Sequence, residues 1–92
     1  MPIEITPRHY GRSKPAWPKC NYYGDRPSQR IIDFCGEEVI RELEIKPLGD
    51  GNPNSTQVHF RKDGIAYHVH KGINTTQQRG KYGYNVYRHI DA

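Results

Sequence analysis

Residues 58–69, VHFRKDGIAYHV, carry the clearest structural signal in the chain. At their centre, Asp63-Gly64 is the dipeptide most typical of a two-residue type I′ turn, and strand-forming residues flank it on both sides. A two-residue turn also fixes the register of the two strands. The facing residues are then Lys62 and Ile65, Phe60 and Tyr67, and Val58 and Val69. We therefore predict a β-hairpin that turns these largely apolar side chains toward a helix.

The other face of the hairpin is polar and rich in histidine. It pairs His59 with His68, Arg61 with Ala66, and Gln57 with His70. Three histidines on one side of a hairpin can hold zinc and leave one ligand position open. However, that face has no carboxylate to orient the ligands, and Arg61 would repel a dication. We therefore interpret His59, His68 and His70 as an ordinary polar sheet surface and assign no metal ligand and no cofactor.

Upstream of the hairpin, the sequence favours one helix that begins after Ser28. Serine is a typical N-cap residue, and here it follows Pro27. The face at helical spacing consists of Ile32, Cys35, Gly36, Val39, Ile40 and Leu43. In a competing interpretation, the helix ends at Gly36 and a strand runs through Val39, Leu43 and Ile45. Because Arg41 interrupts that alternation, we expect the helix to continue.

Two further strands and an irregular arm complete the expected fold. Alternating residues predict a strand at 84–90, and Ile3 and Ile5 fit a short one. Four prolines and two glycines within residues 7–27 disfavour both helix and sheet. We therefore expect an α+β fold: a small antiparallel sheet of three or four strands, one helix packed on one face, and an irregular Pro/Tyr-rich N-terminal arm. Residues 1–92 then form a single domain, with a basic aromatic arm at 1–27 and an α+β core at 28–92.

Composition limits the classes of function. With 34% hydrophobic residues and a mean hydropathy of −0.97, the chain can build only a small core. No apolar run approaches the roughly 20 residues of a membrane span, and the N-terminal MPIEITPRHY lacks the apolar region of a secretory signal. The two cysteines fit neither a disulfide scaffold nor a paired metal motif. We expect no membrane partner and a reducing compartment.

Charge is distributed along the chain in blocks. Residues 1–30 carry a net charge of +4, residues 31–50 one of −4, and residues 51–92 one of +4. Separated blocks favour a surface of which one face attracts polyanions and another does not. The alternative is a solvated surface on which opposite charges partly cancel.

The strongest functional signal is the stretch QQRGKYGY at residues 77–84. Cations contact phosphates, glutamine amides read base edges, and tyrosine rings stack on bases. Basic residues of the hairpin and the arm would extend this surface. The candidate residues for binding nucleic acid or a partner are Arg26, Arg30, Arg61, Lys62, Lys71, Gln77, Gln78, Arg79, Lys81 and Tyr82. The alternative is a loop that leads into an edge strand and whose tyrosines pack on the core.

No catalytic motif accompanies this signal. The chain contains no GxSxG, P-loop, HExxH or dinucleotide-binding fingerprint. Glu37 and Glu38 open the second half of the helical stretch, where carboxylates complement the helix dipole or stay solvated. We therefore expect a protein that is not an enzyme and has no small-molecule substrate.

As a whole, the chain resembles the small phage-encoded anti-CRISPR proteins, in particular inhibitors of type I-F CRISPR surveillance complexes. The resemblance lies in the length, the α+β pattern and stretches such as IIDFCGEEVIRELEIKPLGDG and TTQQRGKYGYNVYRHIDA, and not in a diagnostic motif. It implies a non-enzymatic inhibitor in the host bacterial cytoplasm that binds the assembled effector and blocks target-DNA hybridisation. Such inhibitors contact Cas subunits and guide RNA. Because they share no site pattern, the resemblance assigns no residue here.

The expected function is therefore that of a binding protein that occupies a nucleic-acid-binding surface of a CRISPR ribonucleoprotein. Two alternatives stay open. One is a small metal-independent RNase of the toxin type, which would use histidine, arginine and tyrosine as acid, phosphate clamp and base. The other is a zinc-supported nucleic-acid-binding module.

Overall fold

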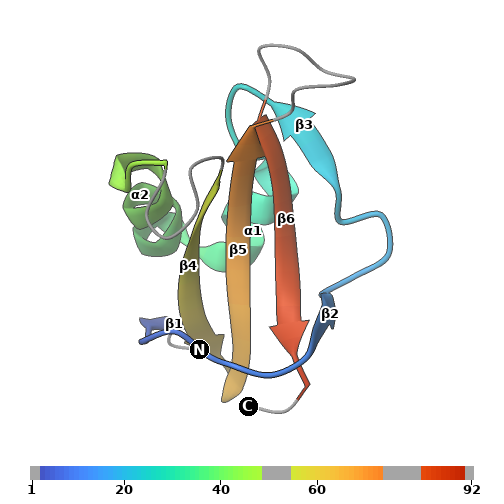
Figure 1. The fold of residues 1–92 in the computed structure, drawn as a ribbon, viewed down its shortest axis with the longest axis vertical. Coiled ribbons are helices and arrows are strands. Elements are labelled where there is room, and N and C mark those ends of the chain that lie inside the picture. The colour runs from blue at the N-terminus through green and yellow to red at the C-terminus, as the bar shows by residue number, and fades with distance from the viewer. Residues whose placement is uncertain (1–2, 49–54, 74–81, 91–92) are drawn as a thin grey trace.

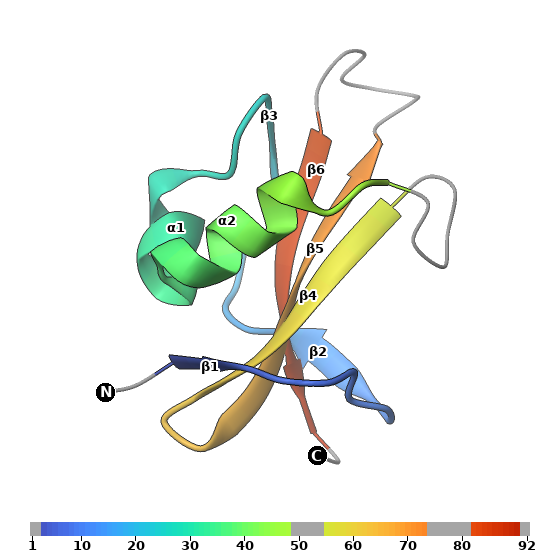
Figure 2. The ribbon, with the colours of Figure 1, turned by 90° about the vertical axis from the view of Figure 1, so that its left-hand side faces the viewer.

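The computed structural model describes residues 3–48, 55–73 and 82–90, and its main element is an antiparallel sheet (Figure 1). Three long strands form its centre: β4 (Ser55–Lys62), β5 (Ile65–Ile73) and β6 (Tyr82–His89). Three short strands flank them: β1 (Ile3–Ile5), β2 (Ser13–Pro15) and β3 (Tyr22–Gly24). The order across the sheet is β1-β4-β5-β6-β2, and β3 also pairs with β6. Two helices, α1 (Gln29–Cys35) and α2 (Glu37–Ile45), lie on one face (Figure 2).

The β4–β5 hairpin forms in the predicted register. Lys62 faces Ile65, Phe60 faces Tyr67 and Val58 faces Val69. The turn residues Asp63 and Gly64 have φ values of +54° and +80°, which a type I′ turn requires. The prediction of this hairpin is confirmed, and its apolar face belongs to the core under the helices.

The expected single helix is wrong, because the chain breaks at Gly36. Ser28 caps α1 as predicted, since its Oγ accepts a hydrogen bond from the amide of Ile31. Gly36 then adopts φ +86° and ψ 156°, a region that is essentially restricted to glycine, and α2 starts at the next residue. The competing interpretation ended the helix correctly at Gly36, but its strand is wrong, because residues 39–45 are helical. The break reorients the chain while both helices keep their apolar faces on the sheet.

The expected sheet of three or four strands with one helix is corrected to six strands with two helices. The additional strands come from the N-terminal arm, which we expected to be irregular. Its residues 13–15 pair with the C-terminal end of β6, and its residues 22–24 pair with the N-terminal end of the same strand. Both pieces are three residues long, which is too short for an alternating pattern to show.

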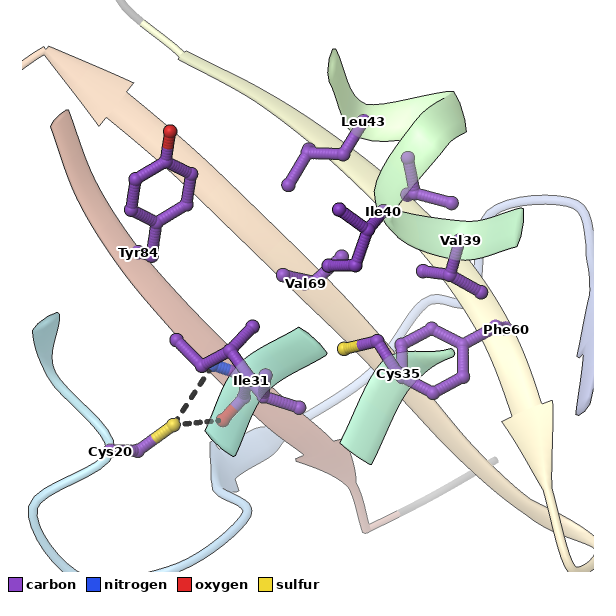
Figure 3. Close-up of a cluster of buried hydrophobic side chains, with 11 residues drawn as sticks. Cys20, Ile31, Cys35, Val39, Ile40, Leu43, Phe60, Val69 and Tyr84 are labelled. Carbon is purple, nitrogen blue, oxygen red and sulfur yellow. Dashed lines mark hydrogen bonds between the residues drawn. The ribbon is translucent and has the colours of Figure 1, made fainter. Parts of the chain in front are cut away.

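The hydrophobic core lies between the helices and the sheet (Figure 3). Val39 and Leu43 of α2 are fully buried, and so are Cys35 of α1 and Phe60 of β4. Tyr84 of β6 closes the core at one end, where its hydroxyl donates to the carbonyl of Asp25 at 3.5 Å. A core of this size leaves the opposite sheet face free for polar groups.

Neither of the two described helices covers that opposite face (Figure 2). The segment between β1 and β2 crosses it near one end of the long strands (Figure 1). Its crossing is fixed at both ends, where the amide of Thr6 donates to the carbonyl of His59 and the amide of Ile90 donates to the carbonyl of Arg12. Within the described ranges, neither helix has the length and apolar character needed to cross a membrane.

Candidate functional site

Two polar regions on opposite faces of the sheet are candidate sites. The first, hereafter the Tyr–Lys surface, consists of Tyr22, Lys71 and Tyr82. Tyr22 of β3 and Lys71 of β5 are both cross-strand partners of the core residue Tyr84 in β6. Their side chains therefore belong to the helix-bearing face of the sheet. The Nζ of Lys71 lies 4.4 Å from the ring centroid of Tyr82, a cation–π contact. Tyr22 is 39% exposed, whereas Lys71 and Tyr82 are half-buried and the Tyr82 ring packs against the core.

A glycine gives the Tyr–Lys surface its local shape. A Cβ atom at Gly24 would lie 2.8 Å from the Tyr22 ring, so this ring lies close across the β3 backbone. Tyr23, the next residue along β3, faces Gly83 and belongs to the opposite sheet face. Glycine has no side chain and therefore leaves room for the Tyr22 ring close to the backbone of residue 24.

Two predicted binding residues do not join this surface. Arg61 and Lys62 lie at the turn of the β4–β5 hairpin, and Lys71 is six residues along β5, a separation of about 20 Å. Lys62 donates to the carbonyl of Phe34 at 2.9 Å, and its Nζ lies 3.9 Å from the Phe34 ring centroid. Arg61 donates to the carbonyl of Gly64 at 2.9 Å. Both cations therefore stabilise the hairpin end rather than extend the binding surface.

The remaining predicted residues fall into two groups. Arg26 and Arg30 flank the start of α1. The Arg26 side chain is 75% exposed and lies 3.8 Å from Glu44, an exposed ion pair of little energetic weight. Arg30 stacks over the Trp17 ring at 4.8 Å. Four further predictions, Gln77, Gln78, Arg79 and Lys81, lie outside the described residues.

The second region is a histidine cluster on the helix-free face, formed by His59, His68 and His89. These residues come from the three central strands β4, β5 and β6. One ring nitrogen of each histidine lies within 4.8 Å of a ring nitrogen of each of the other two. The ring centroids are 4.8 to 5.5 Å apart. His9, from the crossing segment, stacks edge-on against His59 and His89 at 5.5 and 5.3 Å.

Hydrogen bonds fix the rings of the histidine cluster only in part. Nδ1 of His68 and Nε2 of His89 share a hydrogen bond of 2.8 Å. Nδ1 of His59 accepts a hydrogen bond from the backbone amide of His9 at 3.2 Å. The other ring nitrogens of two residues, Nε2 of His59 and Nδ1 of His89, are buried without a hydrogen-bond partner among the described residues. Buried polar atoms are rarely left in this state.

Burial makes neutral imidazole the favoured form throughout the histidine cluster. It lowers the pKa of His59 to about 4, with further contributions from His89, His9, Arg8 and Lys46. It lowers the pKa of His68 to about 3, with contributions from the other cluster histidines, His70 and Arg8. The pKa of His89 is also lowered, mainly by burial. Neutral imidazole is the form that coordinates metals.

Two of these three histidines were expected to be neighbours on this face, although as part of an ordinary polar surface. His59 and His68 face each other as predicted. His70 lies on the same face but outside the cluster, and His89 takes the third place. The alternation of residues 84–90 already put His89 on one face with Tyr87. The missing information was that β6 pairs with β5, which no local sequence signal provides.

A groove at the sheet edge is lined in part by His59 of the histidine cluster. It has a volume of about 440 Å³ and lies between the chain after β1, helix α2 and strand β4. His59 forms part of its wall, together with Arg8, Glu42 and Lys46. His68 and His89 do not line the groove, and Nε2 of His59 is itself buried.

The two cysteines form no reactive centre. The Sγ of Cys20 lies 3.1 Å from the amide nitrogen and 3.4 Å from the carbonyl oxygen of Val86, so it ties the arm to β6. Burial raises the pKa of the Cys35 thiol to about 12. A thiol of this kind stays protonated and unreactive at neutral pH.

Comparisons with models of known protein families, with curated proteins and with solved structures found no match for this chain.

Proposed function

We propose that the chain is a non-enzymatic inhibitor that binds a CRISPR ribonucleoprotein and occupies its nucleic-acid-binding surface in the host bacterial cytoplasm. The observation that carries the binding part of this proposal is the Tyr–Lys surface. The exposed Tyr22 ring, on the same sheet face as the half-buried Lys71 and Tyr82, offers a ring that can stack on an unpaired base and a cation that can contact phosphate. The choice of a CRISPR effector as partner comes from the resemblance of the whole chain.

The sequence between β5 and β6 is basic. The described residues on either side of it, Ile73 and Tyr82, lie at the same end of the sheet as Lys71. Residues 74–81 include Arg79 and Lys81. Guide RNA is therefore the part of the effector that we assign to this end.

Helix α2 supports contact with protein subunits as well. Its outer face exposes four carboxylates: Glu37, Glu38, Glu42 and Glu44. An acidic helix face complements the basic groove in which an effector holds nucleic acid. Two oppositely charged surfaces on one small domain fit a ribonucleoprotein, which offers both phosphate and basic protein, better than they fit naked DNA.

The experiment measures how tightly two variants of the chain bind a purified type I-F effector. Each variant lacks one lysine. We expect Lys71→Ala combined with Tyr82→Ala to weaken binding by about tenfold or more, because one cation and one stacking ring are lost. The matched control is Lys14→Ala, which removes an exposed cation from β2. This strand pairs with the C-terminal end of β6, away from the Tyr–Lys surface. We expect binding within about twofold of the parent chain in that variant.

Two results would contradict the proposal. One is equal binding by the double variant and the parent, which would exclude the Tyr–Lys surface. The other is cleavage of RNA by the purified chain, which would favour the RNase alternative. Circular dichroism of each variant shows whether a loss of binding reflects a loss of fold.

A further inference from the structure

We propose that His59, His68 and His89 form a binding site for a divalent transition-metal ion of the zinc class. This site is separate from the Tyr–Lys surface and does not depend on the proposed function. Its ligands come from three neighbouring strands whose backbones are joined by ladder hydrogen bonds, so the donors are held in place before a metal arrives. Three imidazoles with an open fourth position are a known ligand set for zinc.

The donor spacing is close to what coordination requires. Nδ1 of His68 and Nε2 of His89 are 2.8 Å apart. Two nitrogens at 2.0–2.1 Å from one tetrahedral ion are separated by about 3.3 Å, so the pair has to open by only roughly 0.5 Å. His59 belongs to the same group of donor residues, and its Nε2 is buried without a partner among the described residues. A metal ion would give this atom the partner it lacks.

Coordination through Nε2 of His59 has a structural consequence for the N-terminal arm. Nδ1 of His59 accepts the amide hydrogen of His9, so the ring proton is on Nε2. For Nε2 to bind a metal, that proton has to move to Nδ1, which then cannot accept from His9. Metal binding therefore breaks the bond between His9 and His59 and loosens the crossing segment at this point. In the same way, the proton between His68 and His89 moves to the second nitrogen of the ring that donates it.

Nearby charges set the strength and selectivity of the site. Arg8 and Lys46 line the groove beside His59 and oppose a dication, whereas Glu42 on the same wall attracts it. We therefore expect weaker binding than in structural sites with cysteine thiolates. Imidazole ligands prefer zinc, cobalt, nickel and copper to magnesium and calcium. We therefore expect no binding of magnesium at a metal concentration at which zinc saturates the site.

The test uses the full chain without a polyhistidine tag, freed of metal with a chelator, and titrated with zinc chloride in a calorimeter. We expect one ion per chain. Removing a residue that only hydrogen-bonds to a metal ligand already lowers metal affinity by about 10–100-fold. His89→Gln removes a ligand itself and should therefore weaken binding at least about tenfold. His70→Gln is the matched control, because His70 shares the sheet face but not the cluster, and its affinity should stay within about twofold of the parent.

NMR of the parent chain provides a second readout that needs no variant. With zinc, we expect the ring nitrogens of His59, His68 and His89 and the amide of His9 to shift, and those of His70 to stay. Failure of the parent to bind zinc would overturn the proposal. Binding by His89→Gln at parental affinity would also overturn it, as would shifts confined to other histidines.

Discussion

Acid should unfold this protein because its buried histidines resist protonation only while it is folded. Burial lowers the pKa of His59 to about 4 and that of His68 to about 3, whereas both should be near 6.5 in the unfolded chain. Below pH 6.5 the His59 and His68 rings bind protons in the unfolded state but stay neutral in the folded state. Folding is therefore favoured fully above that pH and loses free energy as the pH falls toward the folded pKa values.

The size of this effect follows from the width of the pH interval. At pH 5.0 the medium is about 1.5 units below the unfolded pKa, which corresponds to about 2 kcal/mol for each histidine. His59 and His68 together then cost about 4 kcal/mol, as an upper limit because the rings interact. A domain of this length has roughly 5–14 kcal/mol of stability in total. The loss is therefore a large share of the free energy of unfolding.

The assay is urea denaturation of chelator-treated protein at pH 7.5 and pH 5.0. We expect the free energy of unfolding to fall by about 2–4 kcal/mol in the parent. The double variant His59→Gln with His68→Gln is the control, and its loss over the same interval should be much smaller. A parent that loses less than about 1 kcal/mol, or a double variant that loses as much as the parent, would refute the reasoning.

Two further predictions concern the helix break and the loop cations. Gly36→Ala should destabilise the fold by about 2–3 kcal/mol, because its backbone region excludes other residues and its Cβ would lie 3.1 Å from Ile3. Gly64→Ala, with positive φ but open space around it, should cost only about 1–2 kcal/mol in the same urea assay, and the reverse order would contradict this account. Arg79→Ala with Lys81→Ala should weaken effector binding several-fold and leave the melting temperature nearly unchanged. Unchanged binding in a pull-down titration would remove these cations from the interface.

The parts of the fold that local chemistry determines could be predicted from the sequence. Asp63-Gly64 specifies a type I′ turn, and the turn fixes the register of the whole β4–β5 hairpin. Ser28 marks the start of α1 because its hydroxyl satisfies a free amide of the first turn. The strand at the C-terminal end was visible in its alternation. Each of these signals lies within a few neighbouring residues.

The parts that depend on distant contacts could not be predicted. Strands β2 and β3 are three residues each, and their pairing with β6 is visible only once that strand is in place. The helix end at Gly36 was part of the competing interpretation, but the helical spacing of the neighbouring residues favoured a continuous helix instead. The third member of the histidine cluster, His89, was missed for the same reason, because it reaches His68 only through the pairing of β5 with β6.

The central claim is that this protein acts by occupying a ribonucleoprotein surface, and the most direct test is a titration of effector activity. Purified chain is added to a fixed amount of type I-F effector, and binding of target DNA is measured at several times after mixing. Inhibition by occupancy should rise linearly, end near one or a few copies per effector, and not change with time. Inhibition far below equimolar amounts that grows with time would indicate a catalyst, and no inhibition at any ratio would exclude this partner.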